Sequence, residues 1–124
     1  MKDFRNVKVW GRAHELTLKL YRTTGRFPRE ELFGLTSQIR RCSASFGANI
    51  AEGCGKRGNA EFQRFLQIAS GPASELDYHL LLAHHLNLIT REHYQRVAGD
   101  LLHLRKKLTS LLQKVEAERL VTKC

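Results

Sequence analysis

The residues from Gly53 to Gly58 read GCGKRG, which matches the G-x-G-x-x-G pattern of dinucleotide-binding loops and adds two cations, Lys56 and Arg57. In such loops the glycines let the backbone approach a pyrophosphate, and the N-terminus of a helix completes the site. The pattern has this meaning only where it follows a β-strand and opens the helix of a βαβ unit. The flanking residues therefore decide whether this segment binds a cofactor.

Metal chemistry is a second candidate, because the chain has six histidines: His14, His79, His84, His85, His93 and His103. A carboxylate-bridged di-iron bundle needs two Glu-x-x-His pairs and two further glutamates that point inward. The nearest approaches are Asp100 with His103 and Glu75 with His79, and the hydrophobic stripes described below contain neither Asp nor Glu. The sequence therefore predicts no metal and no cofactor.

Nucleophilic catalysis is a third candidate. The cysteines Cys42, Cys54 and Cys124 are odd in number, widely spaced and without a C-x-x-C pair, which predicts reduced thiols rather than disulfides or a zinc knuckle. Cys42 lies on an apolar stripe, where a thiol packs as a small hydrophobic group. Cys54 is expected to be exposed but has no evident histidine partner, and no serine elbow follows a strand. We expect no enzymatic activity.

The first half of the chain predicts two amphipathic helices, because apolar residues recur at intervals of three and four. The first spans about residues 6–24, on a stripe of Val9, Ala13, Leu16 and Leu20. Gly25 suits its C-terminus, and Pro28 suits the start of the second helix, with Glu30 and Glu31 in the first turn. The stripe of the second helix comprises Leu32, Leu35, Ile39, Cys42, Phe46, Asn49 and Gly53.

Because a helix precedes GCGKRG, the segment is predicted to be a helix–helix turn and not a dinucleotide loop. Gly53 or Gly55 would supply the left-handed residue that ends the second helix, and Asn59 would cap the third, with Glu61 adding favourable charge. An anion site for an RNA phosphate remains open, since Lys56 and Arg57 stand beside free N–H groups at a helix N-terminus.

Asn49 is a polar residue on the stripe of the second helix, where an apolar side chain is expected. A buried asparagine commonly fixes register or partner choice. The alternative is that its amide faces a ligand or RNA.

The second half predicts two longer helices. The third spans about residues 60–89, on a stripe of Phe62, Phe65, Leu66, Ala69, Ala73, Leu76, Leu80 and Ala83. Pro72 should kink this helix near Gly71 without ending it, because the stripe continues in phase. The fourth begins after the N-cap Thr90 and reaches about Arg119, on a stripe of Tyr94, Val97, Leu101, Leu104, Leu108, Leu111 and Val115.

Short connections between long helices force antiparallel neighbours, so the sequence predicts an all-α, up-down-up-down four-helix bundle that forms one domain over residues 1–124. Leucines at 80, 81, 82, 86 and 88 are too many for one helix face. They imply a neighbour, either the fourth helix or another subunit.

The charge of +9 and the sequence pI near 10.0 favour a polyanionic partner. The net charge is +7 over residues 1–60, −2 over 61–89 and +4 over 90–124. Phosphate contacts should dominate, since no aromatic platform on a strand and no base-reading motif is present. The candidate nucleic-acid-binding residues are Lys8, Arg12, Lys19, Arg22, Arg26, Arg40, Arg41, Lys56, Arg57, Arg105, Lys106 and Lys107. The alternative is that these cations form solvated faces.

The sequence predicts a cytoplasmic protein without a membrane span. The longest uncharged apolar run, LLLA at 80–83, is far below the roughly 18 residues that a span requires. The segment MKDFRNVKVW lacks the apolar stretch of a secretory signal.

Three motifs, FPREELFGLTSQIRR, ANIAEG and EFQRFLQIA, give the chain a likeness over nearly its whole length to a known family. It resembles the bacterial four-helix bundle proteins first met as products of intervening sequences in 23S ribosomal RNA genes. A distantly similar group comprises the accessory variability proteins of diversity-generating retroelements, which bind nucleic acid and a reverse transcriptase. The resemblance implies a basic antiparallel bundle assembled into a homopentameric ring, and it carries over no catalytic residue.

Two positions depart from the family pattern. Phe46-Gly47 stands where Ile-Pro is common before ANIAEG, and Gly71-Pro72-Ala73 stands where Gly-Ser-Leu is common. Both keep a helix-weakening residue near the same place. The resulting hypothesis is a non-enzymatic, oligomeric, basic bundle that binds RNA or another nucleic acid through phosphates, with a ring that binds another protein as the alternative.

Overall fold

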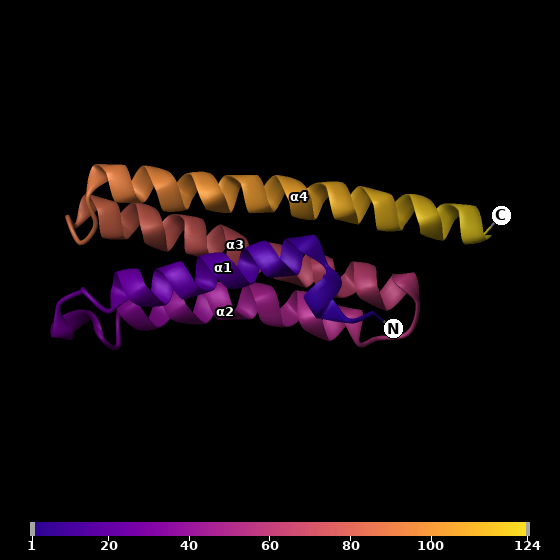
Figure 1. The fold of residues 1–124 in the computed structure, drawn as a ribbon, viewed down its shortest axis with the longest axis horizontal. Coiled ribbons are helices and arrows are strands. Elements are labelled where there is room, and N and C mark those ends of the chain that lie inside the picture. The colour runs from indigo at the N-terminus through magenta and orange to yellow at the C-terminus, as the bar shows by residue number, and fades with distance from the viewer. Residues whose placement is uncertain (1, 124) are drawn as a thin grey trace.

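The computed structural model describes residues 2–123, and within that range the chain forms α-helices and 3-10 helices but no strand. The α-helices are α1 (Lys8–Thr24), α2 (Leu35–Cys54), α3 (Gly58–His85) and α4 (Arg91–Lys123), with short 3-10 helices η1 (Phe4–Asn6) and η2 (Arg29–Glu31). Each helix packs on the next, and α1 also packs on α4, so that the four close into a bundle. Figure 1 shows successive helices running in opposite directions. The predicted all-α four-helix bundle is confirmed.

The core consists of the predicted stripes, with changes only in the second one, at its start and after Phe46. Leu20, Ile39, Leu66 and Leu101 from the four helices are all 1% exposed or less. In α2, however, Ile50 is fully buried. The stripe of α2 therefore moves by one residue past Phe46, because Ile50 and then Cys54 point inward while Asn49 is half-buried at the edge.

The edge position of Asn49 removes the need for a partner across the bundle. Its Nδ2 donates to the carbonyl oxygen of Ser45, one turn earlier in the same helix, at 2.9 Å. The amide is therefore satisfied within α2.

The predicted start of α2 at Pro28 is wrong, because α2 begins at Leu35. The residues after Pro28 form η2, and Gly34 then takes φ −108° and ψ −115°, which no helix contains. The Glu31 carboxylate accepts a hydrogen bond from the Leu35 N–H at 3.2 Å and so acts as the cap of α2. Leu32, predicted to lie on the stripe, is consequently 45% exposed.

GCGKRG contains the turn between α2 and α3, as predicted, but its glycines have other roles than expected. Neither Gly53 nor Gly55 is left-handed, since Gly53 lies inside α2 and Gly55 has φ −80°. The positive φ belongs to Gly58, at +77°. A Cβ on Gly53 would lie 2.8 Å from Cβ of Phe65, so this glycine is what lets α2 approach α3 closely.

Two further predictions at this turn are wrong. Asn59 does not cap α3, because the helix already begins at Gly58. The Nδ2 of Asn59 instead donates to the Glu118 carboxylate of α4 at 3.2 Å. Cys54, expected to be exposed, is only 1% exposed. The cause is the one-residue shift of the α2 stripe, which turns the Cys54 thiol, on the last turn of the helix, toward the core.

The α3 helix runs without interruption through Pro72, as the in-phase stripe predicts. It ends at His85, earlier than the predicted Ile89, because Asn87 adopts a left-handed conformation with φ 61°. The Leu88 N–H then bonds to the carbonyl oxygen of Ala83 at 2.9 Å, and the Asn87 N–H to that of His84 at 3.0 Å. This pair of bonds is a Schellman motif, in which Asn takes the place usually held by Gly.

The start of α4 is confirmed, because Thr90 Oγ1 accepts a hydrogen bond from the His93 N–H at 3.1 Å. The helix continues to Lys123, beyond the predicted Arg119, and Figure 1 shows its last turns extending past the other helices. None of the described helices is long and apolar enough to cross a membrane.

Candidate nucleic-acid interface

A hollow of about 670 Å³ lies between the C-terminal half of α1 and the first turns of α4, and it is called the cationic groove below. Its lining comprises Lys19, Arg22, Thr23, Arg26, Leu88, Ile89, Thr90, His93, Arg96, Val97 and Asp100. Four of these side chains are cations and one is a carboxylate. The apolar residues come from the connection between α3 and α4 and from the first turns of α4, so the groove has an apolar floor and a positive rim.

The two helices line the groove with the same spacing. Residues 19, 22, 23 and 26 of the first segment are separated by three, one and three positions, as are residues 93, 96, 97 and 100 of the second. Positions three and four apart lie on one face of a helix. Each segment therefore turns one face into the groove, and this face is polar apart from the buried Val97.

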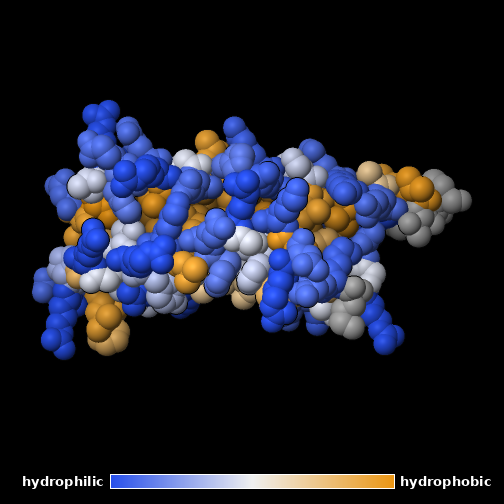
Figure 2. Space-filling view, viewed as in Figure 1, coloured by the Kyte–Doolittle hydropathy of each residue, from blue (hydrophilic) through white to orange (hydrophobic). Residues whose placement is uncertain are grey.

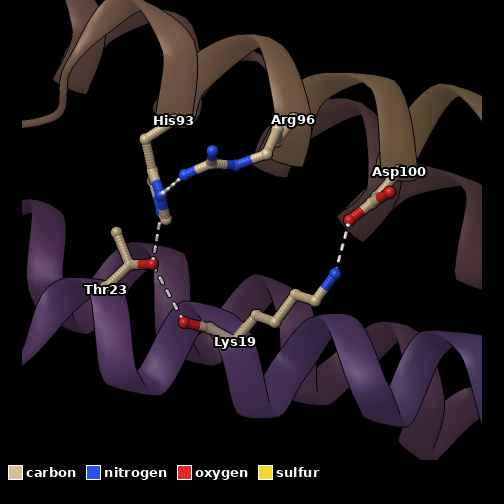
Figure 3. A network of polar contacts seen from close by, with 5 residues as sticks. All are labelled: Lys19, Thr23, His93, Arg96 and Asp100. Atoms are coloured by element: carbon tan, nitrogen blue, oxygen red, sulfur yellow. Dashed lines mark hydrogen bonds and ion pairs between the residues drawn. The ribbon is translucent and has the colours of Figure 1, made fainter.

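Polar contacts connect the two faces (Figure 3). Lys19 Nζ pairs with the Asp100 carboxylate at 3.0 Å. Thr23 Oγ1 donates to the carbonyl oxygen of Lys19 at 2.9 Å and lies 2.7 Å from Nε2 of His93. An Arg96 guanidinium nitrogen lies 3.3 Å from Nδ1 of the same imidazole.

These contacts fix the protonation of His93. Arg96 can only donate, so Nδ1 is the acceptor, and the hydroxyl hydrogen of Thr23 is already used, so Nε2 carries the hydrogen. The pKa of His93 is lowered by burial and by the charges of Arg96, Arg26 and Lys19. At neutral pH the ring is therefore uncharged, although cations surround it.

A smaller hollow of about 200 Å³ continues along the same two helices. It shares Lys19 and Asp100 with the cationic groove and adds Arg12, Glu15 and His103 to its lining. The two hollows together therefore collect four of the predicted cations along α1 and just after it: Arg12, Lys19, Arg22 and Arg26. Figure 2 shows hydrophilic side chains covering much of the face formed by α1 and α4, with apolar atoms between them.

Two of the predicted phosphate-binding arginines are engaged in holding helices together. Arg40 of α2 donates to Thr24 Oγ1 at 2.9 Å and lies 4.7 Å from the ring centre of Tyr21, which secures the end of α1. Arg105 of α4 pairs with the Asp77 carboxylate of α3 at 3.2 Å. Both arginines are half-buried, so their charges serve packing between helices more than contact with a ligand.

The cations at the GCGKRG turn form a second group, called the turn cluster, which comprises Lys2, Lys56, Arg57 and Arg64. Lys56 Nζ and the Arg64 guanidinium lie 5.5 Å and 4.8 Å from the ring centre of Phe65. Lys2 Nζ lies 4.7 Å from that of Phe62. Three of the four cations therefore cover aromatic rings at the α2–α3 interface.

The other predicted cations are dispersed. Lys8 lies in the first turn of α1, whereas Lys106 and Lys107 lie in the middle of α4. None of these three lysines lines the cationic groove. Arg41 is exposed on α2 and donates to the Gln38 side chain at 2.8 Å. Of the twelve predicted residues, the structure brings together Lys19, Arg22 and Arg26 in the groove and Arg12 in its extension.

The sequence did not predict Thr23 or Arg96 as site residues, and it offered His93 only as a metal-ligand candidate. The signal was available, since the polar face of α4 has the same three-and-four spacing as its apolar stripe. What the spacing could not show is which polar faces meet across the bundle.

One group of catalytic residue types lies elsewhere, between α2 and α3. Cys42 Sγ is 3.8 Å from a carboxylate oxygen of Glu75 and 3.8 Å from Nδ1 of His79. Burial and then the Glu75 charge raise the pKa of Cys42, so the thiol stays protonated at neutral pH. Residues 2–123 contain no group of three or more His, Cys, Asp and Glu side chains arranged to hold a metal ion.

Comparisons with known proteins agree with the fold. The profile of a family described as 23S rRNA-intervening sequence protein matches residues 5–110. A crystal structure of a protein with unknown function from the S23 ribosomal protein family of Bacteroides thetaiotaomicron is similar, with 30% sequence identity and a TM-score of 0.75. The similarity covers 84% of this chain and 97% of that one. No protein of curated function matches significantly.

Proposed function

The chain belongs to the 23S rRNA-intervening sequence protein family, and from this membership and the cationic groove we propose that it binds RNA through phosphate contacts. The observation that carries the proposal is the convergence of Lys19, Arg22, Arg26 and Arg96 on one hollow that contains a single carboxylate. Cations held on two helix faces neutralise phosphates without reading bases, which gives affinity that depends on salt more than on sequence.

The dimensions of the groove and its extension suit a nucleic-acid strand. The helical part of the segment that carries these cations, residues 12–24, spans about 18 Å, which is long enough for several successive phosphates. The apolar floor at Leu88, Ile89 and Val97 would lie under a base or a ribose, while Arg22 and Arg26 on the rim would reach the backbone. The family is named for intervening sequences in 23S rRNA, so a structured rRNA is the first polyanion to test.

We propose binding without catalysis. The Cys42 thiol is held protonated, and the groove offers a single carboxylate, Asp100, which is paired with Lys19. We also propose a cytoplasmic location, where RNA is accessible and the buried thiols of Cys42 and Cys54 stay reduced.

A homo-oligomer, pentameric by resemblance, is the second part of the proposal. Apolar side chains are exposed along α1 and the connection to α2: Leu18 44%, Tyr21 43%, Leu32 45% and Phe33 93%. Figure 2 shows an apolar protrusion at the end of the bundle where that connection lies. Contact with another subunit would remove this surface from water. The alternative function, an adaptor that binds a different protein, uses the same surface.

The RNA proposal is tested by the salt dependence of binding. Fluorescence anisotropy with a labelled structured RNA should give an affinity that falls steeply as salt increases, and Arg26→Gln should reduce the slope of log K against log salt by about one. If the wild type does not bind RNA at low salt, RNA binding is excluded and the adaptor function is favoured.

The oligomer is tested separately by light scattering of the purified protein. Phe33→Glu should give a smaller species than the wild type, because it places a charge on the exposed apolar surface. A wild-type protein that is monomeric at high concentration would contradict this part of the proposal.

A further inference from the structure

We propose that His93 is a phosphate-binding residue of the cationic groove, and that it takes up a proton when the groove binds phosphate and releases it when the groove is empty. The inference rests on the proposed function, because it assigns a ligand and a regulation to that same site. It predicts that the groove binds its anion more tightly as the pH falls from neutral.

The first support is that the neutral ring has no free position. Nδ1 accepts from Arg96 at 3.3 Å, and Nε2–H donates to Thr23 Oγ1 at 2.7 Å. Thr23 in turn donates to the carbonyl oxygen of Lys19 at 2.9 Å. The chain of bonds therefore holds the imidazole in one tautomer and holds the Arg96 guanidinium against the ring (Figure 3).

Protonation breaks one of these bonds and leaves the others intact. A hydrogen on Nδ1 would face the hydrogens of Arg96, since a guanidinium has five N–H donors and no acceptor. Arg96 must then swing away from the ring, while Nε2–H keeps its bond to Thr23. Both the released guanidinium and the new Nδ1–H become donors for an oxyanion in the same hollow.

The charges around the ring decide when this exchange occurs. His93 is faced by Lys19 and Arg22 of α1, by Arg26 just after that helix, and by Arg96 and Asp100 of α4, whereas residues 88–90 carry no charge. In the empty groove the cations and burial keep the imidazole neutral. A bound phosphate cancels their field and accepts a hydrogen bond from the ring, so the charged imidazole becomes favourable.

Proton uptake and anion binding are therefore linked. If binding raises the pKa of His93, the affinity must increase as the pH falls through the range between the two pKa values. The affinity should rise by about tenfold for each unit by which the anion raises the pKa. Phosphodiesters do not titrate in this range, so the dependence would come from the protein.

The first measurement is an NMR titration of the histidine rings of the full chain with and without sodium sulfate, whose charge is constant from pH 4.5 to 8. The His93 resonance is assigned by its loss in His93→Gln. We expect a pKa below the ordinary range without sulfate and a clear rise with it. A His93 pKa that sulfate leaves unchanged would overturn the proposal.

The second measurement is RNA affinity against pH at constant ionic strength for the wild type, His93→Gln and His14→Gln. His14 is an exposed histidine of α1 that packs on Trp10, away from the groove. The wild type and His14→Gln should bind more tightly at acidic pH, whereas His93→Gln should show a flatter profile. A His93→Gln profile as steep as the wild type would refute the role of His93.

The two measurements separate this inference from RNA binding itself. If sulfate raises the His93 pKa but no RNA binds at any pH, the proton-linked anion site is retained and the RNA function fails. If RNA binds with the same pH profile in all three proteins, RNA binding is retained and the proton-linked site fails.

Discussion

The cationic groove and the turn cluster lie near opposite ends of the bundle (Figure 1) and hold four cations each, but they place them differently. In the groove, side chains from two helices and the turn after α1 face a common hollow, and only Lys19 has a carboxylate partner there. In the turn cluster, Lys2, Lys56 and Arg64 lie over phenylalanine rings. In the groove the positive charge faces a solvent-accessible hollow, whereas at the turn it covers apolar surface.

The comparison shows why the most suggestive motif was not the best candidate site. GCGKRG contains glycines and cations at phosphate-loop spacing, yet Gly53 serves the close approach of α2 to Phe65. The groove residues are separated by 70 positions or more between its two helices and form no motif. Convergence in space, rather than density in sequence, identifies the stronger anion site.

The largest expected effect comes from reversing two charges in each region. Arg22→Glu with Arg26→Glu should weaken RNA binding by at least about 100-fold at low salt, because each lost charge-assisted contact contributes about 1.5–3 kcal/mol. Lys56→Glu with Arg57→Glu changes the net charge equally and should weaken binding only severalfold. Anisotropy at matched ionic strength measures both, and equal losses would show that binding follows net charge alone.

A second prediction concerns the glycines of the turn. Gly53→Ala places a Cβ 2.8 Å from Cβ of Phe65, whereas Gly99→Ala in α4 meets no atom within 4 Å. Both variants gain helix propensity, so the difference between their free energies of unfolding isolates the packing cost, which should be roughly 1–3 kcal/mol against Gly53→Ala. Urea denaturation followed by circular dichroism measures it. Equal stabilities would contradict a packing role for Gly53.

A third prediction concerns a variant that makes the cationic groove more positive without adding a cation. Asp100→Asn removes the single carboxylate from the lining and frees Lys19, so RNA affinity should increase severalfold. Because the ion pair is exposed, the variant should lose no more than about 1 kcal/mol of stability. Asp77→Asn, which frees Arg105 outside the groove, is the matched control and should leave affinity nearly unchanged. A larger gain from the control would place the RNA surface elsewhere.

The smallest expected effect is that of His93 on how thermal stability changes with pH. The folded protein lowers the pKa of His93, so the unfolded chain binds the proton more tightly. The stability that comes from neutral His93 is therefore fully present above the unfolded pKa of about 6.5. It is lost as the pH falls below that value toward the folded pKa. Thermal unfolding should therefore show a smaller decrease in Tm between pH 7 and pH 5 for His93→Gln than for the wild type. An identical decrease would mean that His93 does not titrate differently in the two states.

Much of the fold follows from local periodicity. The apolar stripes predicted four helices because a three-and-four spacing places side chains on one face whatever the neighbour is. The boundaries were less predictable where backbone conformation decided them. The backbone at Gly34 interrupts the helix expected from Pro28, and the left-handed Asn87 ends α3 four residues early. Neither glycine nor asparagine is forced by its type to adopt these backbone conformations.

The sequence by itself determined the helices, their apolar faces, the Thr90 cap and the excess of positive charge, since each depends on residues a few positions apart or on composition. Only the tertiary structure decided which polar faces meet. Lys19 and Thr23 face His93, Arg96 and Asp100 because α1 packs beside α4, and the burial of Cys54 follows from how far α2 extends against α3. Packing between helices depends on contacts between residues far apart in the chain. The spacing of apolar residues along one helix cannot specify which residues of another helix it contacts.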